Sequence, residues 1–148
     1  MKKKQIDWLL LILYLAALLY ATLFRGSSGY MKNAPLGEYI RAMTNLVPFA
    51  SIATYVKALF NHRMNLSTPL LNLGGNLILF MPLPYFLQRL TGCTPKQQLF
   101  TTFLAILAVE ILQLLTRTGS FDIDDLILNM TGAALVCFLC EGASKTDL

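Results

Sequence analysis

The sequence predicts an all-α membrane protein, a compact bundle of four transmembrane helices with an interfacial helix in the long first outer loop. Two observations predict this fold. Hydrophobic residues make up 55% of the 148 residues and charged residues only 14%, whereas soluble domains are about 45 to 50% apolar. A helix needs about 20 apolar residues to cross a bilayer, and four suitable stretches lie at about 6–24, 70–90, 98–116 and 123–140. The length allows one such bundle, so we expect a single domain over 1–148.

The first apolar stretch, 6–24, follows a cluster of lysines at 2–4. A Lys cluster before a span holds that end in the cytoplasm. A cleaved signal peptide is the alternative, because a basic start and an apolar centre fit it too. The stretch is longer than the apolar centre of a signal peptide and lacks a small-x-small cleavage site, which favours an uncleaved helix. Arg89 and Lys96 flank the loop after the second span, so the charges predict that both termini are cytoplasmic.

The segment 25–69 is more polar and is expected on the outer side of the membrane. Apolar residues recur at helical spacing in 39–43 and 50–60, which indicates a helix lying in the membrane interface. Pro48 lies between the two stretches and prevents one continuous helix.

The second span contains two kinds of residue that shape a membrane helix. Gly74 and Gly75 are predicted to let a neighbouring helix approach closely. Pro82 and Pro84 are predicted to kink or end the helix towards the cytoplasm.

Charge and cysteine content argue against several classes of protein. The net charge of +4 does not indicate nucleic-acid binding, because the Lys and Arg residues lie in flanks and loops and not on one face with interleaved aromatic residues. The cysteines are Cys93, Cys137 and Cys140. Their odd number and spacing match neither a disulfide framework nor a zinc site, so we expect no metal and no cofactor. Cys137 and Cys140 are interpreted as small helix-packing residues.

Most of the intramembrane charge falls in the stretch 110–134. Helical spacing predicts two polar stripes on either side of a turn at 118–120, one formed by Glu110, Gln113 and Arg117 and the other by Asp122, Asp125 and Asn129. An ionisable group in hydrocarbon costs about 2.5 to 3.5 kcal/mol on insertion scales. These stripes are therefore a hypothesis for a functional site.

The predicted topology places the polar groups of all four spans at one depth. Arg25 ends the first span, Asn72 and Asn76 lie in the outer part of the second, and Asp124 joins the acids of the last. We expect them to line a pocket open to the outer leaflet or the exterior. The alternative is that these groups only join helices, each pair contributing about 0.6 kcal/mol.

Several motifs follow one another along nearly the whole chain. They are Arg25, NLVPF at 45–49, N-x-x-x-F-x-P at 76–82, E-x-x-Q at 110–113, Arg117, and FDIDDLILNMTGA with Asp125, Asn129 and Gly132. Together they resemble the VanZ-like family of bacterial membrane proteins. Family proteins often have Gly after the proline of N-x-x-x-F-x-P, where this chain has Leu83 and Pro84. The resemblance implies an integral protein of the bacterial cell membrane. The family's founding member is associated with resistance to teicoplanin, a glycopeptide antibiotic that carries an acyl chain.

The first functional hypothesis is a binding protein for an amphiphile, either a lipoglycopeptide or a lipid-linked cell-envelope precursor, among the membrane lipids. Arg25 and Arg117 would hold an anionic group bidentately, amides would hydrogen-bond it, and apolar walls would take the acyl chain. The candidate ligand-binding residues are Arg25, Asn45, Asn72, Asn76, Glu110, Gln113, Arg117, Asp122, Asp125 and Asn129.

The second hypothesis is a membrane-embedded enzyme, with Glu110 and Asp125 as acid and base or as metal ligands acting on a lipid-linked substrate. Asp122 and Asp124 could join Asp125 in holding a divalent ion. The sequence has no set of residues for nucleophilic catalysis, and its one histidine, His62, lies in a loop. Transport is a third hypothesis, which the apolar inner halves of the spans do not favour.

Overall fold

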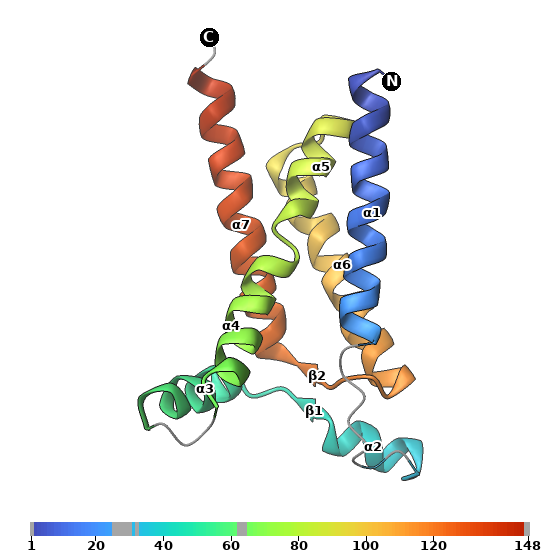
Figure 1. Cartoon of the computed structure of the whole chain (residues 1–148), viewed down its shortest axis with the longest axis vertical. Coiled ribbons are helices and arrows are strands. Elements are labelled where there is room, and N and C mark those ends of the chain that lie inside the picture. Colours follow the sequence, from blue (N-terminus) through green and yellow to red (C-terminus); the bar gives the residue numbers. More distant parts are fainter. Residues whose placement is uncertain (1, 25–30, 32, 62–64, 147–148) are drawn as a thin grey trace.

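Figure 1 shows a computed structural model of the chain, which describes residues 2–24, 31, 33–61 and 65–146. Four segments are long and apolar enough to cross a membrane, namely Lys3–Leu23, Ser67–Thr91, Pro95–Thr116 and Ile123–Glu141. They form an all-α bundle, as the sequence predicts, and the chain is a multi-pass membrane protein. The start of α1 (Lys3–Leu23) and the end of α7 (Ile123–Thr146) lie at the same end of the bundle (Figure 1).

Two helices make up the second span, α4 (Ser67–Leu79) and α5 (Pro82–Thr91). Pro82 begins α5, which confirms that the prolines end the preceding helix. The carbonyl of Leu79 loses its usual helical partner at the break and instead accepts a hydrogen bond from the Tyr14 hydroxyl at 2.9 Å. Such replacement of backbone partners is what makes a broken helix tolerable in a membrane.

The break changes the neighbours of the second span. α5 packs against α1, whereas α4 leans away from α1 and packs mainly against α7 (Figure 1). α6 (Pro95–Thr116) contacts both α1 and α7. The bundle is therefore closed around α5 and opens between α1 and α4.

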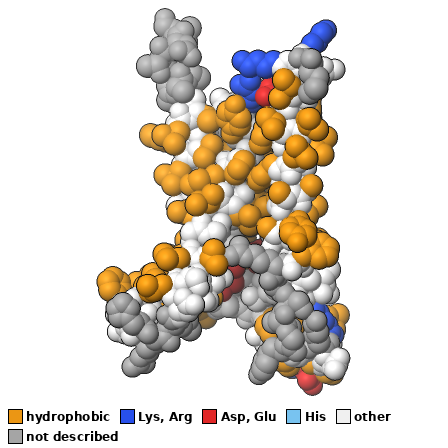
Figure 2. Space-filling view, in the orientation of Figure 1, with side chains coloured by type: hydrophobic (Ala, Val, Ile, Leu, Met, Phe, Trp, Pro, Cys, Tyr) orange, Lys and Arg blue, Asp and Glu red, His pale blue; other side chains and the backbone are white. Residues whose placement is uncertain are grey.

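The apolar core lies in the closed part of the bundle. Its buried members are Leu11, Leu18, Phe80, Leu83, Phe86, Leu90 and Ile106. The outer surface of the spans is also apolar, and Figure 2 shows hydrophobic side chains along them. Phe100 and Phe138 are 64% and 77% exposed, which fits contact with lipid.

Gly132 supplies the close helix approach that was expected from Gly74 and Gly75. A Cβ at Gly132 would lie 1.8 Å from the carbonyl oxygen of Leu77, so α7 and α4 touch through their backbones here. A Cβ at Gly74 or Gly75 would meet nothing within 4 Å. The prediction for these two glycines was wrong, because no neighbouring helix in the described part of the chain comes this close to either one.

The end of the bundle remote from the termini carries α2 (Leu36–Ala42) and α3 (Ala50–Asn61), which lie across the direction of the spans (Figure 1). Between them, β1 (Thr44–Asn45) pairs in parallel with β2 (Phe121–Asp122). α3 begins and ends close to the helix expected at 50–60.

The two predicted polar stripes are not continuous helix faces. Asp122 lies in β2, one residue before α7 begins. Arg117 follows the last residue of α6 in the left-handed conformation, with φ of 59°. Each predicted stripe therefore includes a residue outside its helix, to which helical spacing does not apply.

Candidate functional site

Asp124 fastens α3 to the start of α7. Its Oδ1 accepts a hydrogen bond from the backbone N–H of Phe49, and its Oδ2 accepts from those of Ser51 at 2.8 Å and Ile52 at 3.1 Å. These are N–H groups at the beginning of α3, which have no partner within the helix. Asp124 has no exposed surface. Its carboxylate therefore has a structural task and does not face a ligand.

Asn45 and Asp122 form a second link beside this cap. The Nδ2 of Asn45 donates to Asp122 Oδ1 at 3.2 Å and to Ser51 Oγ at 3.1 Å, and Ser51 Oγ donates to Asp122 Oδ2. One helical turn after Ser51, burial raises the pKa of Tyr55, and the nearby carboxylates of Asp125 and Asp122 raise it further. Acidic residues thus surround the inner side of α3.

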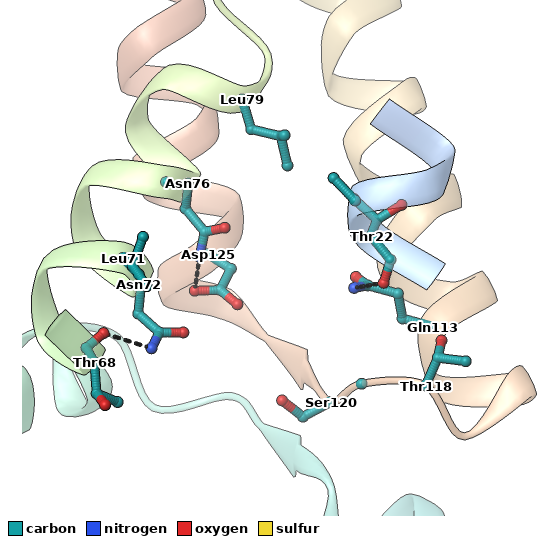
Figure 3. A pocket seen from close by; sticks show the side chains of 13 residues that line it. Thr22, Thr68, Leu71, Asn72, Asn76, Leu79, Gln113, Thr118, Ser120 and Asp125 are labelled. Atoms are coloured by element: carbon teal, nitrogen blue, oxygen red, sulfur yellow. Dashed lines mark hydrogen bonds between the residues drawn. The ribbon is translucent and has the colours of Figure 1, made fainter. Parts of the chain in front are cut away.

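A cavity of about 380 Å³ lies where α4 leans away from α1. Its lining residues come from α1, α4, α6, α7 and the loop before β2, and they are Ala21, Thr22, Thr68, Leu71, Asn72, Gly75, Asn76, Leu79, Gln113, Thr118, Gly119, Ser120 and Asp125. Figure 3 shows Asn72, Asn76 and Asp125 on one side of this space and Thr22 and Gln113 on the other.

Each amide in the cavity wall is held by one hydrogen bond. Asn76 Nδ2 donates to Asp125 Oδ1, which joins α4 to α7. Asn72 Nδ2 donates to the Thr68 carbonyl at 2.8 Å, and Gln113 Nε2 donates to the Thr22 carbonyl at 2.9 Å. These bonds fix the side chains in place while their remaining polar atoms line the space.

The structure thus brings four of the predicted ligand-binding residues into one cavity: Asn72, Asn76, Gln113 and Asp125. Glu110 and Asn129 are 5% and 1% exposed and are not among the lining residues. Glu110 Oε2 accepts from the Asp122 backbone N–H at 3.4 Å, and Asn129 Nδ2 donates to the Asp125 carbonyl at 2.8 Å. Both stabilise the surroundings of the cavity.

Arg117, one of the two arginines expected to hold an anion, is placed differently. The Arg117 guanidinium lies 5.3 Å from the centre of the Tyr39 ring, and the Tyr39 hydroxyl donates to the Gly119 carbonyl at 2.8 Å. Arg117 is not among the residues that line the cavity. Arg25 and His62 lie outside the described residues. The role of Arg25 and Arg117 in holding an anionic group stays a prediction.

In the described part of the chain, no group of three or more His, Cys, Asp or Glu side chains is arranged to hold a metal ion.

The hydroxyl residues of the site were not selected from the sequence. Thr22, Thr68 and Ser120 line the cavity and Ser51 bonds to Asp122. Short polar residues are common near helix ends, so nothing in their spacing distinguished them.

Comparison with known proteins agrees with the motifs of this chain. The family model described as VanZ/LLP1 matches residues 11–143, which covers most of the first span, the other three spans and every residue of the cavity wall. The search of curated proteins and the search of solved structures found no match. The match to the family model extends over nearly the whole chain, and this protein belongs to the VanZ/LLP1 family.

Proposed function

We propose that this protein binds the head group of an amphiphilic or lipid-linked cell-envelope ligand in the cavity between α1 and α4. The proposal locates the protein in the bacterial plasma membrane with both termini in the cytoplasm and the cavity at the outer face. Lys and Arg side chains gather at the end of the bundle where α1 begins (Figure 2), and positive charge is retained on the cytoplasmic side.

The carrying observation is that the cavity joins polar and apolar surfaces. Asn76, Gln113 and Asp125 supply hydrogen-bonding groups, whereas Leu71 and Leu79 supply apolar wall. Ligand sites commonly combine a mostly apolar surface with a few placed polar groups, in volumes of about 300 to 1,000 Å³. A volume of about 380 Å³ holds a head group and not a whole lipid. An acyl chain would leave the cavity between α1 and α4 into the bilayer.

The resemblance to the VanZ-like family extends this proposal to antibiotic resistance. Teicoplanin is itself an amphiphile, with a polar glycopeptide and an acyl chain. Binding of teicoplanin or of a lipid-linked envelope precursor in the cavity would contribute to survival in the antibiotic.

The enzyme hypothesis receives less support from the geometry. Asp125 lines the cavity, but Glu110, its expected partner in acid and base catalysis, does not line it and bonds to the backbone of Asp122. General acid and base catalysis needs both groups within reach of the reacting atoms. One accessible carboxylate among amides favours binding over chemistry.

Filling the cavity tests the proposal. Gly75 lines the cavity, and a Cβ there would meet nothing within 4 Å, so the side chain of Gly75→Leu would begin in open space at the cavity wall. Gly74→Leu is the matched control, because Gly74 is equally open but does not line the cavity. Both changes replace Gly by a better helix former.

The two variants and the wild type are expressed in a teicoplanin-sensitive bacterial host, with protein amounts in the membrane measured alongside survival. We expect Gly75→Leu to abolish the increase in survival and Gly74→Leu to retain it, at equal protein amounts. Retained survival with Gly75→Leu would contradict a role for the cavity.

A further inference from the structure

The open polar groups of the cavity differ from those expected for an anion site. The amides of Asn72, Asn76 and Gln113 each direct their nitrogen to an oxygen that can only accept a hydrogen bond. Their orientation is therefore fixed by their partners. Within the described residues, the oxygens of these three amides have no hydrogen-bond partner.

Asp125 is the only ionisable residue among the described residues that line the cavity. Its Oδ1 accepts from Asn76, and Oδ2 has no hydrogen-bond partner in the described part of the chain. Figure 3 shows the carboxylate at the side of the open space, beside Asn76. A carboxylate only accepts hydrogen bonds, and it binds most strongly to donors that carry positive charge.

Resting on the proposed function, we infer that the head group bound in this cavity carries a primary ammonium, which pairs with Asp125 Oδ2 and with the amide oxygens around it. An ammonium group has three donors and no acceptor. It fits one carboxylate oxygen with the Asn72 and Asn76 oxygens nearby better than a phosphate does, because a phosphate would be repelled by Asp125.

Two kinds of amphiphile offer such a group, an aminophospholipid and a lipid-linked or acylated amino sugar. Both match a cavity of about 380 Å³ with an apolar exit past Leu71 and Leu79. Both carry the ammonium group, so the experiment compares each compound with its N-acetyl form, which lacks the charge.

The purified protein is titrated with lysophosphatidylethanolamine and its N-acetyl form, and with dodecyl glucosaminide and its N-acetyl form, using native mass spectrometry. The N-methyl form of the lipid, which adds bulk but keeps the charge, serves as a size control. We expect the ammonium form of at least one pair to bind about tenfold more tightly than the acetylated form. The N-methyl lipid keeps the charge and two of the three donors, so it should bind more tightly than the acetylated form, and Asp125→Asn should remove the preference. The pair that shows the preference identifies the source of the amine.

Equal affinity within both pairs for the wild-type protein would overturn the inference, and so would a preference that survives in Asp125→Asn. Either outcome can be told apart from failure of the proposed function, because the binding measured with Gly75→Leu tests the proposed function separately. If Gly75→Leu abolishes binding of every form while the pairs bind equally, the cavity is the site but does not select an ammonium. If Gly75→Leu changes no affinity, both proposals fail.

Discussion

Replacement of Gly132 by Ala is expected to separate α7 from α4 at the close contact of Gly132 with Leu77. The new Cβ would lie 1.8 Å from the carbonyl oxygen and 2.9 Å from the carbonyl carbon of Leu77, and 3.2 Å from Met81 Cγ. A carbon and a carbonyl oxygen approach to about 3.3 Å at the closest. The two helices must therefore move apart by about 1.5 Å, because the obstacle is backbone and cannot rotate away.

The cost follows from this geometry. Overpacking a well-packed interior costs about 1 to 3 kcal/mol and occasionally more, and a clash of the new Cβ with a backbone carbonyl belongs at the upper end, at about 3 kcal/mol. Separation also strains the hydrogen bond between Asn76 and Asp125, which joins the same two helices beside the cavity. Gly132→Ala should therefore lower both stability and ligand binding.

The control is Gly74→Ala, in the same helix pair but with open space around the new Cβ. Ala is favoured over Gly in a helix by about 0.8 to 1.0 kcal/mol, so this variant should be as stable as the wild type or more stable. The measurement is the fraction of protein that stays folded after heating in detergent, followed by size-exclusion chromatography. Equal stability of the Gly132→Ala variant and the wild type would refute the close backbone contact.

Two further predictions concern the end of the bundle at α3 and the orientation of the protein. Asp124→Ala removes the acceptor of three backbone N–H groups, and hydrogen exchange in 49–61 should accelerate about tenfold or more; unchanged exchange would show that α3 is held by other contacts. Ser120 and Thr94 are both exposed, and each is replaced by cysteine in a variant of the protein that has no other cysteine. In intact cells, an impermeant thiol reagent should label the cysteine at position 120 and not the one at position 94. The opposite pattern would reverse the topology.

The main features of the fold follow from sequence, because long apolar stretches and prolines have few alternatives in a membrane. The four spans follow from the length and hydropathy of the apolar stretches. Pro82 cannot continue the preceding helix, so the break in the second span also follows from the sequence. The change of direction that the break gives the second span could not be predicted from the sequence. Only the packing of α4 on α7 shows that the second span leaves α1 and opens a cavity, and that Gly132 takes the role expected of Gly74.

The candidate site was predicted in part for a related reason. Asn72, Asn76, Gln113 and Asp125 were selected by depth in the membrane, and depth is what brings them to one cavity. Depth does not tell which way a side chain points. Adjacent acids illustrate this limit, because Asp124 caps α3 while the neighbouring Asp125 faces the cavity.

The most direct test of the account is a density map of the wild-type protein in bilayer discs made from bacterial lipids, with Gly75→Leu as the reference. The account predicts density that touches Asp125 and Asn76 and continues between α1 and α4 into the bilayer, and its loss in the variant. A cavity that holds only water in both proteins, or helices α1 and α4 in direct contact with no space between them, would contradict it.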